Sequence, residues 1–60
     1  MKHIDDELPE KGINIRGLDP NGYEYICFRC TCTNPNCLEW QDAKTKLGLI
    51  IDIVQWEYLN

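Results

Sequence analysis

The chain has 60 residues, four of them cysteine, and a formal net charge of −4 from ten acidic and six basic side chains. A domain of this length buries only about 60% of the surface that its unfolded chain exposes. This excludes a second domain, a nucleotide-binding α/β unit and a multi-residue catalytic cleft. The hydrophobic fraction of 43% still indicates a folded chain. We therefore expect one domain over residues 1–60 that needs added stabilisation, with no enzyme activity and no small-molecule substrate.

The distribution of charge disfavours nucleic acids and membranes as binding partners. The six basic residues are scattered singly, whereas binding to nucleic acid or to an anionic membrane relies on clustered Lys and Arg. The most apolar stretch, residues 47–54, is too short to span a membrane and contains Asp52. The first residues lack the apolar core of a signal peptide. We expect a cytoplasmic protein with reduced thiols that binds neither nucleic acid nor membrane.

The first half of the chain predicts an arm and a β-hairpin. Residues 1–11 are polar and acidic, which indicates a flexible arm. Residues 12–28 combine the alternation of Ile13–Arg16 with the aromatic and β-branched stretch Tyr23–Phe28, a pattern typical of two strands. The sequence Asp-Pro-Asn-Gly between them at residues 19–22 favours a tight turn.

The last third of the chain has helical periodicity. Asn34-Pro35 resembles a helix start, with a capping residue followed by proline at the first helical position. The apolar residues that follow recur with helical spacing, at Trp40, Ala43, Leu47, Ile50, Ile51, Val54 and Tyr58. We therefore predict an amphipathic helix over residues 35–59 and a small α+β fold of type ββα. The alternative is a break at Gly48 and a strand over residues 49–58, because isoleucine and valine favour strands.

The four cysteines lie within residues 27–37, at Cys27, Cys30, Cys32 and Cys37. In a reducing compartment such a cluster indicates metal ligands more readily than disulfides. We predict one structural Zn²⁺ held by all four thiolates in a closed tetrahedron that ties the hairpin to the helix. Structural zinc contributes about 10–16 kcal/mol of apparent binding energy in finger peptides. The alternatives are buried or disulfide-bonded cysteines without metal, and an iron–sulfur cluster.

One segment resembles a known family. The sequence Cys32-Thr33-Asn34-Pro35-Asn36-Cys37-Leu38-Glu39-Trp40 resembles the second cysteine pair of Ogr/Delta-type zinc fingers. These are small phage proteins that activate late-gene transcription by contacting host RNA polymerase and DNA. The resemblance implies a metal-binding role for Cys32 and Cys37 and a phage-encoded protein. The chain departs from the family in the short spacing between its cysteine pairs and in its acidic charge.

The predicted helix carries a second apolar stripe of Leu49, Ile53 and Trp56. Exposed apolar patches mark interaction sites, and tryptophan is favoured at their centres. We therefore predict that this stripe binds a protein partner or a second copy of the chain; the alternative is that the arm and hairpin cover it. The sequence as a whole predicts a small zinc-binding regulatory or adaptor protein, phage-encoded and directed at host machinery. The rival function is that of a zinc-finger DNA-binding transcription regulator.

Overall fold

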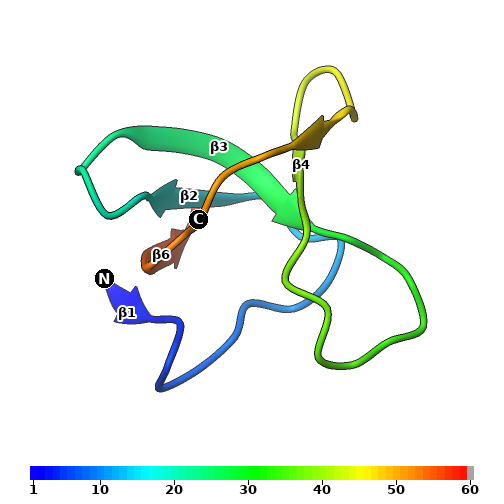
Figure 1. Cartoon of the computed structure of the whole chain (residues 1–60), viewed down its shortest axis with the longest axis horizontal. Coiled ribbons are helices and arrows are strands. Elements are labelled where there is room, and N and C mark those ends of the chain that lie inside the picture. The colour runs from blue at the N-terminus through cyan, green and yellow to red at the C-terminus, as the bar shows by residue number, and fades with distance from the viewer. Residues whose placement is uncertain (60) are drawn as a thin grey trace.

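The computed structural model describes residues 1–59, which form a single antiparallel sheet of short strands. In chain order the strands are β1 (Lys2–His3), β2 (Ile15–Leu18), β3 (Glu24–Arg29), β4 (Trp40–Asp42), β5 (Gly48–Leu49) and β6 (Gln55–Tyr58). Their order in the sheet is β1-β6-β2-β3-β4-β5. Strands β2 to β5 form a meander, β6 returns to pair with β2, and β1 pairs with the other side of β6 (Figure 1).

The predicted helix over residues 35–59 and the ββα fold are wrong, because residues 1–59 contain no helix. The segment instead supplies β4, β5 and β6. Its β-branched residues Ile50, Ile51, Ile53 and Val54 lose side-chain freedom in a helix, and they lie in the connection between β5 and β6 rather than in the strands themselves. The alternative of a strand after a break at Gly48 is closer to the structure, although two short strands separated by a loop replace the single one. None of the described residues belongs to a helix that could cross a membrane.

A side-chain-capped turn reverses the chain where the helix was predicted. One Asp42 carboxylate oxygen, Oδ1, accepts hydrogen bonds from the backbone N–H groups of Lys44 and Thr45, at 2.7 and 3.1 Å. Lys46 then adopts a left-handed backbone conformation with φ of 66°. Such local side-chain bonds compete with helix formation. The chain therefore folds back and pairs β5 with β4.

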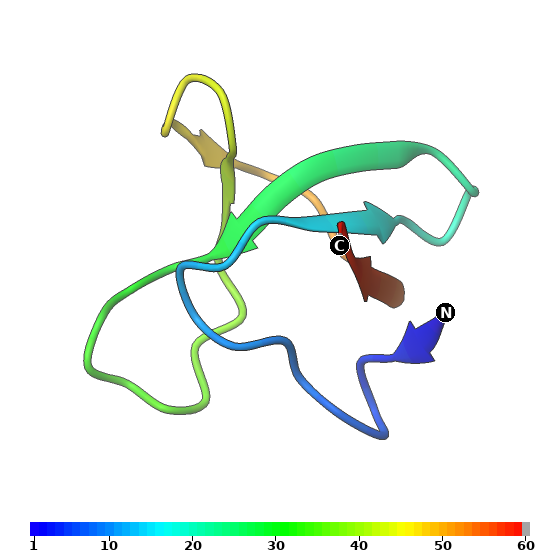
Figure 2. The same cartoon turned by 180° about the vertical axis from the view of Figure 1, so that it is seen from behind.

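Within residues 12–28, β2 pairs with β3 in an antiparallel hairpin. At its turn, Asp19 Oδ1 accepts the N–H groups of Asn21 and Tyr23, at 2.9 and 2.8 Å. Gly22 has φ of 87°, which glycine adopts without steric cost. The β3–β4 loop and the β4–β5 turn project from separate places on the sheet in both views (Figures 1 and 2).

The core is formed by Ile15, Cys27, Trp40, Ile53 and Trp56. Gly17 of β2 is opposite Trp56 of β6, and it leaves room for Ile53 above it. A Cβ atom on Gly17 would lie 2.9 Å from Cδ1 of Ile53, closer than carbon atoms pack. Glycine is therefore required here by a close approach between side chain and strand.

The predicted partner-binding stripe of Leu49, Ile53 and Trp56 is part of this core. Trp56 is fully buried and Ile53 is 5% exposed, while the half-buried Leu49 packs against the core cluster. With no helix in the described residues to carry it, the stripe does not form one surface: Ile53 and Trp56 are buried, and only Leu49 is partly accessible. Coverage by the rest of the chain, the alternative that the sequence left open, is what the structure shows.

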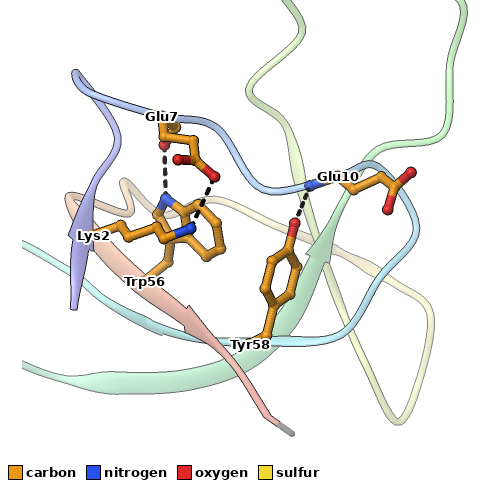
Figure 3. A network of polar contacts seen from close by, with 5 residues as sticks. All are labelled: Lys2, Glu7, Glu10, Trp56 and Tyr58. Carbon is orange, nitrogen blue, oxygen red and sulfur yellow. Dashed lines mark hydrogen bonds and ion pairs between the residues drawn. The ribbon is translucent and has the colours of Figure 1, made fainter.

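The N-terminal segment, which the sequence predicted to be a flexible arm over residues 1–11, packs across the core (Figure 3). The Trp56 indole N–H donates to the Glu7 carbonyl at 2.8 Å, and the Glu10 N–H donates to the Tyr58 hydroxyl at 3.0 Å. Lys2 lies over the Trp56 ring and forms an ion pair of 2.9 Å with Glu7. The segment is held because a buried indole N–H needs an acceptor, which the chain itself supplies.

Candidate metal centre

Three of the four cysteines come together in the β3–β4 loop. The Sγ atoms of Cys30, Cys32 and Cys37 all lie within 4.8 Å of one another. Two thiolates on one tetrahedral zinc ion, each about 2.3 Å from the metal, are about 3.8 Å apart. Cys32 is exposed, whereas Cys30 and Cys37 are half-buried. The group could therefore close on one metal ion at the surface of the domain with only a small contraction.

Backbone hydrogen bonds bend the loop so that its cysteines meet. The Cys30 N–H donates to the Glu39 carbonyl at 2.8 Å, which continues the pairing between the ends of β3 and β4. Asn34 organises the tip: its side-chain oxygen accepts the Asn36 N–H at 2.9 Å, and its carbonyl accepts the Cys37 N–H at 3.2 Å. The turn thus returns Cys37 toward the start of the loop.

Arg29, the last residue of β3, anchors this loop from inside the protein. The residue is only 5% exposed. Its guanidinium donates to the carbonyl oxygens of Pro9 at 2.8 Å, Pro35 at 3.1 Å and Cys37 at 3.1 Å. A buried charge is costly unless it is hydrogen-bonded, and these three acceptors satisfy its two terminal nitrogens. The buried Nε has no hydrogen-bond partner among the described residues. Arg29 therefore joins the N-terminal segment to the chain that carries the third thiol.

Lys11 brings a second positive charge to the group from the N-terminal segment. Its ammonium donates to the carbonyl oxygens of Cys32, at 2.6 Å, and of Asn34, and its Nζ lies 3.7 Å from the Cys32 Sγ. The pKa of Cys32 is lowered to about 7, first by a hydrogen bond from Cys37, then by the backbone of Asn34 and by Cys30, with Lys11 adding to the effect. The thiolate, which is the form that binds metal, is thus favoured near neutral pH.

Cys27 lies apart from this group, which corrects the prediction of four ligands. It is completely buried in the core on β3, and β3 stays extended through Arg29. Three residues of extended strand cover about 10 Å, so a Cys-x-x-Cys spacing cannot form a knuckle here. Burial, together with the nearby Asp42 carboxylate, raises the pKa of Cys27 to about 11. Cys27 is therefore a neutral core thiol.

The three-thiol group fits a metal that prefers sulfur ligands, such as zinc. Among residues 1–59, no further cysteine, histidine, aspartate or glutamate completes it to four. A tetrahedral ion held here would keep one position for a ligand from outside the group, in contrast to the closed site that the sequence predicted.

The sequence reasoning missed Lys11 and Arg29. The sequence does contain a signal for Arg29: it lies two positions after the core residue Cys27, on the same face of β3, and directly precedes Cys30. Lys11 has no such signal, because it reaches Cys32 across 21 positions of sequence. Only the packing of the N-terminal segment on the sheet brings it there.

Comparison of the chain with protein-family models, curated proteins and solved structures finds no match. The resemblance of residues 32–40 to Ogr/Delta-type zinc fingers therefore stays a prediction. Of its residues, Cys32 and Cys37 belong to the three-thiol group, and Trp40 packs in the core.

Proposed function

We propose that this chain is a small zinc-stabilised adaptor protein. One Zn²⁺ bound by Cys30, Cys32 and Cys37 would fix the β3–β4 loop on the sheet, and the domain would act by contact with another protein. The observation that carries the metal-binding part is the convergence of three thiols within 4.8 Å on a loop that Arg29 and Lys11 already hold. A loop ordered before binding loses less entropy when the ion binds, which raises affinity.

Zinc is favoured over the two other states of the thiols that the sequence left open. Iron–sulfur clusters are usually held by four cysteine thiolates, whereas three converge here. A disulfide within the group would use two thiols and leave the third without a partner. Zinc takes sulfur ligands without redox chemistry and accepts three protein ligands plus one from outside. The exposed side of the group at Cys32 leaves access for that additional ligand.

The adaptor role is supported by what the domain leaves on its surface. Leu38 and Ile50 are 47% and 103% exposed and line the same groove. Single exposed apolar side chains are ordinary, but gathered ones mark contact sites. The net charge of −4 and the dispersed basic residues disfavour the rival function of DNA binding. A protein partner is therefore the better match to this surface.

Native mass spectrometry of protein purified without added metal tests the zinc assignment. We expect one zinc per chain and four reduced thiols. Titration with Co²⁺ should give thiolate charge-transfer absorption that is lost in Cys30→Ser, Cys32→Ser and Cys37→Ser. The matched control is Cys27→Val, which replaces a buried thiol by a side chain of similar size and should keep metal binding. A metal-free chain with a disulfide, or loss of Co²⁺ binding in Cys27→Val as severe as in the other three, would contradict the proposal.

A further inference from the structure

A groove of about 770 Å³ is lined by the β2–β3 turn, the end of the β3–β4 loop, β4, and β5 with the residues that follow it. Its apolar wall is formed by Tyr25, Leu38, Trp40, Leu49, Ile50 and Ile51. The acidic residues along it are Asp19, Glu39 and Asp52, and no lysine or arginine lines it. Within residues 1–59, neither Glu39 nor Asp52 forms an ion pair with a basic side chain. The groove is thus apolar along its wall and negatively charged.

The groove includes the edge strand of the sheet. β5 pairs only with β4 and is the last strand on that side. The Asp42 N–H donates to the Leu47 carbonyl at 2.8 Å, so residues 47 and 49 face β4. By the alternation of an antiparallel ladder, Gly48 and Ile50 direct their N–H and C=O groups outward. A Cβ at Gly48 would meet nothing within 4 Å, so the face of β5 at this residue is open.

The chain continues beyond β5 in a strand-like pattern without a partner. From Leu49 to Ile53, half-buried or buried residues alternate with exposed ones. Among the described residues, the backbone groups of residues 50–53 form no backbone hydrogen bond. An open edge with apolar side chains is a template for pairing with another chain. A row of unpaired peptide groups beside an apolar groove is the arrangement that peptide-binding domains use to add a strand.

We infer that β5 and its continuation to residue 53 bind an extended segment of a partner protein as an added strand. The alternation sets the chemistry of that segment. On the face of Leu49 and Ile51 it would present apolar side chains, and on the face of Asp52 basic ones, since opposite charges stabilise cross-strand pairs. The stem of a lysine can also cover the exposed Ile50. The ligand is thus a segment that alternates apolar and basic residues.

A second copy of this chain is a poorer occupant of the same edge. Each copy carries a net charge of −4, and each would bring its own acidic groove residues to the contact. Like charges that face each other across strands are destabilising. The charge of the groove therefore favours a basic segment from another protein. This inference rests on the proposed adaptor role and is independent of which metal the three-thiol group holds.

The test uses the full chain labelled with ¹⁵N and three capped peptides as probes. One peptide alternates valine and lysine, the second alternates valine and glutamate, and the third alternates glycine and lysine. Titration followed by amide chemical shifts should show saturable changes at residues 48–53 with the valine–lysine peptide. The valine–glutamate peptide should bind at least about tenfold more weakly, because its charge has the same sign as that of the groove. The glycine–lysine peptide lacks the apolar contacts and should also bind at least about tenfold more weakly.

Two matched variants assign the effect to the edge. Ile50→Lys removes an apolar contact and adds a positive charge; because Ile50 is 103% exposed, the substitution leaves the core intact. It should lower affinity for the valine–lysine peptide by about tenfold or more. Leu47→Lys makes the same change at a residue that is 68% exposed and does not line the groove. Its affinity should stay within about twofold of wild type, the size of a distant, screened charge effect.

The outcomes separate this inference from the adaptor role. Shifts that map to another face, such as β1, would overturn the edge assignment and leave the adaptor role standing. Absence of binding by every peptide would count against both. Sedimentation that shows a dimer which Ile50→Lys dissociates would assign the edge to a second copy and overturn the basic-segment inference. Equal binding of the lysine and glutamate peptides would overturn the charge argument in the same way.

Discussion

Replacement of Arg29 by methionine should destabilise the domain and weaken its metal site together. Arg29 is 5% exposed and donates to three carbonyl oxygens, of Pro9, Pro35 and Cys37. A hydrogen bond to a charged group contributes about 1.5–3 kcal/mol. The net loss is smaller than three such bonds, because methionine fills part of the volume and the cost of burying a charge disappears. We expect the free energy of unfolding to fall by about 2–4 kcal/mol.

This loss is large for a chain of 60 residues, whose total stability is about 3–9 kcal/mol at 0.05–0.15 kcal/mol per residue. Urea unfolding followed by tryptophan fluorescence measures it, because Trp40 and Trp56 are buried and become exposed on unfolding. The Zn²⁺ affinity should fall about tenfold in parallel, since the carbonyl of Cys37 loses its anchor and about 1.4 kcal/mol of preorganisation with it.

The matched control is Arg16→Met. Arg16 is an exposed residue that forms ion pairs of 3.3 Å with Glu24 and Glu57. Exposed ion pairs contribute about 0–1 kcal/mol, so this variant should lose no more than that and keep its zinc affinity. Arg29→Lys retains the charge with fewer donors and should fall between wild type and Arg29→Met. A change below about 0.5 kcal/mol in Arg29→Met, the range of ordinary surface substitutions, would refute the anchoring role. A loss in Arg16→Met as large as that in Arg29→Met would refute it equally.

Three further predictions concern the core and the thiols. Gly17→Ala should lower the free energy of unfolding by about 1–3 kcal/mol, because its Cβ would lie 2.9 Å from Cδ1 of Ile53. In a double-mutant cycle, Ile53→Val removes that Cδ1 atom and should recover part of the loss. Strictly additive effects of the two substitutions would contradict the contact. The pKa of Cys27 is raised from 9.0 to about 11, so the folded state favours the neutral thiol. The contribution of this thiol to stability should be fully present below pH 9 and be lost as pH rises through about 11, a total of about 3 kcal/mol at 1.36 kcal/mol per pKa unit. Cys27→Val should lack this loss in urea titrations. Removal of zinc from the zinc-loaded protein by a chelator should lower the midpoint of urea unfolding in wild type but not in Cys32→Ser. An equal fall in both proteins would place the metal elsewhere.

Local chemistry made part of this protein predictable from its sequence. The turn at residues 19–22 and the alternation on either side of it indicate a hairpin, and β2 pairs with β3 there. The thiols of Cys30, Cys32 and Cys37 lie close in sequence, so a short loop is enough to bring them together. The prediction for the last third of the chain was wrong because its apolar residues have helical spacing although several of them are β-branched, and periodicity alone does not decide between a helix and strands. The Asp42 turn and pairing with β2 and β4 decide for strands.

Long-range packing decided the remaining features. Whether Cys27 is a ligand or a core residue depends on how far β3 stays extended, which its pairing with β2 and β4 sets. Trp56 is buried because the N-terminal segment supplies an acceptor for its indole N–H, and composition alone marked that segment as a solvated arm. Lys11 reaches the thiols by the same route. Composition and spacing thus determined which side chains could bind a metal, whereas contacts between segments far apart in sequence decided which of them meet, because burial and charge pairing depend on the whole fold.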